Sequence, residues 1–168
     1  MRISSPVRLR MAVCVLLVWG CAHASAQPSP EHVIRQALSQ RLLAGASDST
    51  LREAAVPPAD VRRIVTLNLD TGLSGSLVSS AGTEFRFNEP QQRLDSQVSV
   101  LVLIYPNHAV ALRMNRSLAK RGGYFTGTKI LTRFSSVPVR NQLVIAFTEN
   151  AGNDAVVKFI DAVPRLFD

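Results

Sequence analysis

One run of residues constrains this fold more than any other: VSVLVLIY, which ends the segment Ser96–Tyr105. Nearly all of its residues are apolar and favour β-structure, so we predict a strand here. A strand with one face in water would alternate apolar and polar side chains, and this run does not. We therefore predict that both faces of the strand are covered, which requires a sheet with other elements packed on each side.

Three stretches have the spacing of amphipathic helices, with apolar residues three or four apart. Each follows a residue that can cap a helix: Ser29 precedes Ile34, Leu38 and Leu42; Asn107 precedes Val110, Met114 and Leu118; Asp154 precedes Val156, Ile160 and Val163. Helices at these positions would supply the cover that the apolar strand needs.

Alternating or apolar runs predict further strands at 65–69, 73–79, 84–88, 128–134 and 142–148. Gly82 is expected to join two of them, and Pro138 to lie in a loop. Asp48 is expected to cap a short turn of helix through Ala54. The order of elements predicts an α+β fold, in which a mainly antiparallel sheet packs with about three helices in a single small domain.

The first 26 residues have the three parts of a secretory signal: a basic start, an apolar centre and a small-residue end. The apolar centre, Met11–Trp19, is well short of the ~20 residues that cross a bilayer as a helix. Ala24-Ser25-Ala26 would place cleavage before Gln27. We then divide the remainder into an N-terminal helical segment, 27–60, and an α+β core, 61–168, within the same domain. No later segment is long and apolar enough to predict a transmembrane helix in the mature chain.

A second cleavage site is also present. Val18-Trp19-Gly20-Cys21 resembles a bacterial lipobox, which would place cleavage before Cys21 and attach lipid to that cysteine. The first site implies a protein in the periplasm or secreted, and the second implies one anchored to the outer membrane through Cys21. Both alternatives place the protein in or beyond a bacterial cell envelope.

Few residue types suited to catalysis or metal binding follow the leader. Both cysteines, Cys14 and Cys21, precede Gln27, so the mature domain has neither a disulfide nor a cysteine metal site. His32 and His108 are its only histidines, and no cluster of ligands surrounds either in the sequence. We therefore predict no metal and no cofactor.

The positive charge is concentrated in one block. Of the 19 Lys and Arg residues, Arg2, Arg8 and Arg10 lie in the leader, which leaves 16 against 12 Asp and Glu. Residues 96–148 hold seven of those 16 and no acid.

Within this block, Arg113, Arg116 and Lys120 would share one helix face, because they are three and four residues apart. Lys129, Arg133 and Arg140 would extend that face if the following strands lie beside it. The alternative is an ordinary solvated helix face.

Leu67-Asn68-Leu69-Asp70-Thr71-Gly72 resembles the Asp-Thr-Gly active-site loop of retropepsin-type aspartic proteases. That resemblance implies a homodimer, because the chemistry needs two carboxylates that share one proton and the chain has one such triplet. The alternative is a tight turn in which Asp and Gly serve the backbone.

These observations favour a small exported protein that acts by binding rather than by catalysis. We expect the partner to be another envelope or exported protein, with the chain serving as an accessory subunit of an envelope system or as an inhibitor or immunity protein. Anionic lipid or wall polymer are alternative partners, whereas export argues against nucleic acid. The competing hypothesis is the homodimeric aspartic protease that uses Asp70. Capture of a small ligand between sheet and helix would leave no signal in the sequence.

Overall fold

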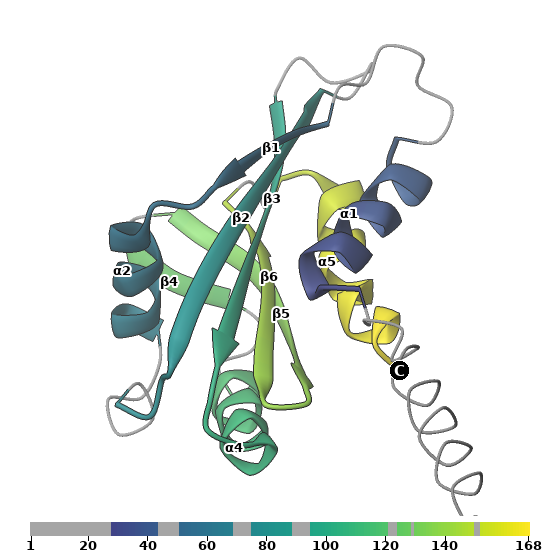
Figure 1. The fold of residues 1–168 in the computed structure, drawn as a ribbon. Helices are drawn as coiled ribbons and strands as arrows, with labels where there is room; N and C mark the ends of the chain where they lie inside the picture. Colours follow the sequence, from purple (N-terminus) through teal and green to yellow (C-terminus); the bar gives the residue numbers. More distant parts are fainter. Residues whose placement is uncertain are drawn as a thin grey trace, which may run out of the picture.

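The computed structural model describes residues 28–43, 51–68, 75–88, 95–120, 124–128, 130–149 and 152–168. They form an α+β domain in which one antiparallel sheet packs with helices on both faces (Figure 1), as the sequence predicts. Four α-helices are described, one more than expected: α1 (Pro30–Arg41), α2 (Pro58–Asn68), α4 (His108–Ala119) and α5 (Asp154–Ala162). A 3₁₀ turn, η1 (Val163–Leu166), follows α5.

The sheet has six strands in the order β1-β2-β3-β6-β5-β4, and every neighbouring pair is antiparallel. In chain order they are β1 (Arg52–Ala55), β2 (Ser79–Asn88), β3 (Asp95–Ile104), β4 (Tyr124–Thr128), β5 (Ile130–Val139) and β6 (Gln142–Thr148). Strand β3 is the predicted apolar strand, and it lies between β2 and β6. Its central position explains why its sequence lacks polar alternation.

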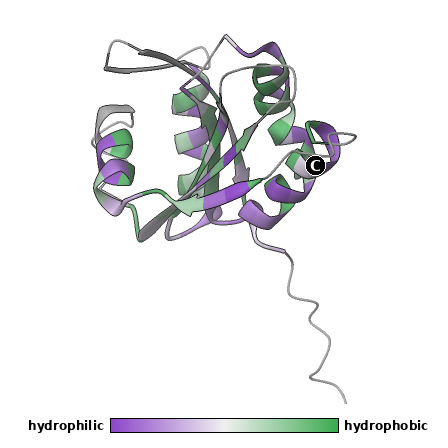
Figure 2. Ribbon diagram, turned by 90° about the horizontal axis from the view of Figure 1, so that it is seen from above, coloured by the Kyte–Doolittle hydropathy of each residue, from purple (hydrophilic) through white to green (hydrophobic). Residues whose placement is uncertain are grey.

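Successive residues of β3 point into two separate cores. Leu101 and Leu103 enter the α4 core, which packs α2 and α4 on one face of the sheet. Val100 and Val102 enter the α5 core, which packs α1 and α5 on the other face. Figure 2 shows helices with hydrophobic residues on one side and hydrophilic residues on the other. The prediction that both faces of this strand are covered is confirmed.

The prediction of a strand at 65–69 is wrong, because this segment lies in α2 as far as Asn68. Val61 and Val65 are buried one helical turn apart, with Ile64 packed against the same core. Val65 therefore belongs to a helical stripe with Val61 and Ile64 rather than to an alternating strand. The Pro57 carbonyl accepts hydrogen bonds from the backbone amides of Asp60 and Val61, which starts the helix at Pro58.

Residues 52–55 form strand β1, so the predicted turn of helix through Ala54 is wrong at its C-terminal end. Ser79–Asn88 is one continuous strand that passes through Gly82, so the predicted break there is wrong. Of the described residues in the predicted strand 73–79, only Ser79 lies in a strand. A Cβ at Gly82 would lie 2.8 Å from the Val56 Cβ and 2.9 Å from the Leu101 Cδ2. Val56 and Leu101 flank Gly82 on its two sides, since the Val56 amide donates to the Gly82 carbonyl and Leu101 faces Gly82 on β3. Glycine at this position therefore leaves room for both side chains.

Two further differences concern β4 and β5. Strand β4 has no counterpart among the predicted strands, apart from its last residue. Pro138, expected in a loop, lies in β5 opposite Leu143 of β6. Beyond Arg133, β5 has only β6 as a described neighbour, so Pro138 occupies an edge-like stretch where a missing N–H donor is tolerated.

Candidate functional site

The first candidate site is the outer face of α4, which we call the basic face: Arg113, Arg116 and Lys120. All three side chains are exposed. On the opposite side of the helix, Met114 and Leu118 are almost fully buried in the α4 core. The predicted sharing of one face by these three cations therefore agrees with how the helix packs.

Helix α4 is fixed firmly to the sheet. The Asn107 side chain accepts a hydrogen bond of 3.1 Å from the Val110 amide and caps the helix. In its middle, Asn115 accepts a hydrogen bond of 2.6 Å from the Ser136 hydroxyl of β5. At its start, the His108 Nδ1–H donates a hydrogen bond to the Arg140 carbonyl, which connects the helix to the β5–β6 turn. The basic face is consequently held by a rigid support.

The other residues predicted to extend this surface are placed differently. Arg133 of β5 donates two hydrogen bonds, of 3.0 and 2.9 Å, to the carboxylate of Asp161 on α5. Its neighbour Phe134 packs in the α4 core, so Arg133 lies on the opposite face of the sheet from α4. Lys129, and the Asp70-Thr71-Gly72 loop, lie outside the described residues.

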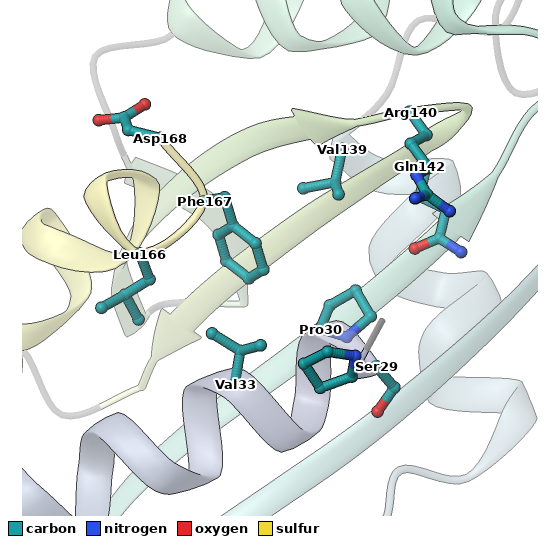
Figure 3. A pocket seen from close by; sticks show the side chains of 10 residues that line it. Ser29, Pro30, Val33, Val139, Arg140, Gln142, Leu166, Phe167 and Asp168 are labelled. Atoms are coloured by element: carbon teal, nitrogen blue, oxygen red, sulfur yellow. The ribbon is translucent and has the colours of Figure 1, made fainter. Parts of the chain in front are cut away.

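The second candidate site is a pocket of about 520 Å³ where three distant segments meet (Figure 3). The first turn of α1, the β5–β6 hairpin and the chain after η1 form its walls. Its lining residues are Pro28, Ser29, Pro30, Val33, Val139, Arg140, Gln142, Leu166, Phe167 and Asp168. The sequence does not predict this pocket, because no motif connects residues so far apart.

A third feature is a buried hydroxyl. Tyr105 is fully buried in the α4 core, and its hydroxyl has no hydrogen-bond partner within the described part of the chain. Desolvation by burial raises the pKa of Tyr105 to about 12, because the charged phenolate is disfavoured away from water. The group stays neutral and inert at ordinary pH, so we assign it no chemical role.

Two kinds of feature are absent from the described residues. No group of three or more His, Cys, Asp or Glu side chains there is placed to hold a metal ion. Among the same residues, no helix has the length and apolar character needed to cross a membrane.

No protein-family model, curated protein or solved structure matches this chain. The functional assignment therefore depends on the chain's own geometry.

Proposed function

We propose that this chain is an exported cell-envelope protein that acts by binding another protein, and that the basic face of α4 is its docking surface. The observation that carries the proposal is a set of three exposed cations on one helix that is capped and hydrogen-bonded to the sheet. Among the described residues, no acidic side chain forms an ion pair with Arg113, Arg116 or Lys120. Elsewhere, Arg35 and Arg133 face Glu53 and Asp161 respectively.

The chemistry of this face favours an acidic partner. Single-sign charge on a surface raises the rate of encounter with a surface of the opposite sign and disfavours surfaces of like sign. The partner is thus a protein with an acidic patch, and binding weakens as salt screens the charges. Periplasmic location is part of the proposal, with secretion or an outer-membrane lipid anchor at Cys21 as the alternatives.

The test compares three forms of the tagged full-length chain, expressed with its own leader in a bacterial host. The first is wild type, the second is Arg113→Ala/Arg116→Ala/Lys120→Ala, and the control is Arg41→Ala/Arg62→Ala/Arg63→Ala. The control removes the same charge from exposed positions on α1 and α2. Proteins retained at low salt are identified by mass spectrometry and then washed at high salt.

We expect wild type and control to retain the same acidic protein, and the α4 variant to lose it. Equal retention by all three forms would exclude the basic face as the docking surface. Asp70→Asn should leave retention unchanged, whereas a protease would lose turnover with this substitution. The intact mass of the purified product separates cleavage before Gln27 from cleavage and acylation at Cys21.

A further inference from the structure

The pocket at the start of α1 has an apolar centre. Leu166, Phe167 and Val139 pack against the α5 core while also lining the pocket, and Val33 faces it from α1. In Figure 3 the ring of Phe167 lies between the side chains of Val139 and Val33. Because core contacts hold three of these residues, the apolar surface is largely preformed, as in small-ligand sites.

The two charged residues of the lining lie on either side of this centre. Figure 3 shows Asp168 on one side of Phe167 and Arg140 on the other, with Gln142 beside Arg140. The lining thus contains an acidic residue, an apolar middle, and an arginine next to a glutamine. The complementary ligand has a cation at one end, an apolar body and an anion at the other.

Arg140 occupies a conformation that is unfavourable for arginine. Its φ is +56°, in the left-handed region, and it stands in the two-residue turn between Val139 and Gln142. Glycine or asparagine is the usual choice at such a position, and other residues cost about 1–2 kcal/mol. The Arg140 carbonyl is held by His108, and the Asn141 side chain donates a hydrogen bond of 3.1 Å to the Tyr105 carbonyl. These hydrogen bonds hold the turn in place. The backbone conformation does not favour arginine, so it does not explain why arginine occupies this position.

From this arrangement we propose that the pocket binds short peptides with apolar side chains and free termini. The peptide carboxylate meets Arg140 and Gln142, the ammonium meets Asp168, and an apolar side chain packs on Phe167. A guanidinium suits a carboxylate because it presents several N–H donors in one plane. The pocket volume, about 520 Å³, lies within the range of small-ligand sites. This proposal does not depend on the basic face of α4.

The test uses di-, tri- and tetraleucine, each in four forms: free, N-acetylated, C-amidated and blocked at both ends. Each is titrated into ¹⁵N-labelled mature protein and followed by NMR. We expect the amide signals of Val33, Gln142 and Phe167 to shift, and those of Arg113 and Arg116 to stay in place. Blocking either end should weaken binding by about two- to fivefold, as for exposed ion pairs.

Two variants test which residue binds each end of the peptide. Arg140→Asn tolerates the left-handed turn, so it should fold and should bind free and C-amidated peptides equally. Asp168→Asn should bind free and N-acetylated peptides equally. The α4 variant Arg113→Ala/Arg116→Ala/Lys120→Ala should bind peptide like wild type, which separates this proposal from the proposed function. Absence of binding, shifts located elsewhere, or equal affinity for all four forms would overturn the proposal.

Discussion

The helices on the two faces of the sheet bury apolar surface in the same way, but they place their charges differently. On the α1 and α5 face, Arg35 meets Glu53 at 3.5 Å and Arg133 meets Asp161 at 2.9 Å, each pair joining a helix to a strand. On the other face, the three cations of α4 point outward with no ion pair among the described residues. Two ion pairs thus connect helices to strands on the first face, whereas the cations of the basic face make no such connection among the described residues.

The two faces also differ in how their polar groups are satisfied. In the α5 core, the buried Asn153 donates a hydrogen bond of 2.8 Å to the buried Ser96 hydroxyl and also caps α5. In the α4 core, the buried Tyr105 hydroxyl has no such partner within the described residues. Among the described residues, the buried polar groups of the α5 core are therefore better satisfied than the Tyr105 hydroxyl of the α4 core.

The largest effects should come from truncation of each core. Met114→Ala in the α4 core and Ile160→Ala in the α5 core should each lower the free energy of unfolding by about 2–5 kcal/mol. Both side chains are fully buried. Urea denaturation followed by circular dichroism measures the loss. A large loss from one substitution and almost none from the other would show that a single layer stabilises the domain.

Gly82→Ala tests the close approach of Val56 and Leu101 to Gly82. The added methyl would lie under 3.0 Å from Val56 and Leu101, so the backbone must shift, at a cost of about 1–3 kcal/mol. Thermal unfolding of this variant is compared with that of Ala81→Gly, which has no such contact to make. An unchanged midpoint for Gly82→Ala would contradict the observed approach.

The two helix caps should differ in how much each contributes to the free energy of unfolding. Asn107→Ala removes an exposed cap from α4 and should cost about 1 kcal/mol. Asn153→Ala removes a cap and also a partner of the buried Ser96 hydroxyl, so we expect a loss of about 2 kcal/mol or more. Chemical denaturation ranks the two variants. Equal losses would mean that the buried bond adds nothing to the cap.

Tyr105→Phe should be neutral or stabilising by up to about 1 kcal/mol at neutral pH, because it removes a buried hydroxyl without a partner. The wild type should lose stability as pH rises from 10.0 to about 12. Above pH 10 the unfolded tyrosine ionises, while burial keeps the folded one protonated. The free energy of unfolding should therefore fall less steeply with pH for the variant than for the wild type across this range. Identical slopes would show that the Tyr105 hydroxyl is solvated in the folded protein.

The smallest effects should come from the charged residues themselves. Arg133→Ala should cost up to about 1 kcal/mol, since it breaks a partly exposed pair with two aligned hydrogen bonds. Arg113→Ala should leave stability unchanged within error. Thermal unfolding at low and high salt measures the stability of both variants. A clear loss from Arg113→Ala would show that α4 cations stabilise the fold and would weaken the proposed docking role.

The sequence by itself determined the central strand, three of the helices and the three cations of the basic face. These features depend on local periodicity: a run without polar alternation must be covered on both sides, and residues three and four apart share a helix face. The caps Ser29 and Asn107 were also predicted, because a capping side chain bonds to its own helix, here to the amides of His32 and Val110 respectively. The prediction of Asp154 as the third cap is wrong by one residue, because Asn153 caps α5.

Only the tertiary structure decided the nature of 58–68, the position of Pro138 and the existence of the pocket. At 58–68 the apolar spacing fits both a strand and a helix, and packing of Val61 and Val65 against the sheet selected the helix. Pro138 is tolerated because β4 does not reach it, which is a fact about a neighbouring strand. The pocket joins Ser29, Arg140 and Phe167, and only the folded chain brings residues so far apart together.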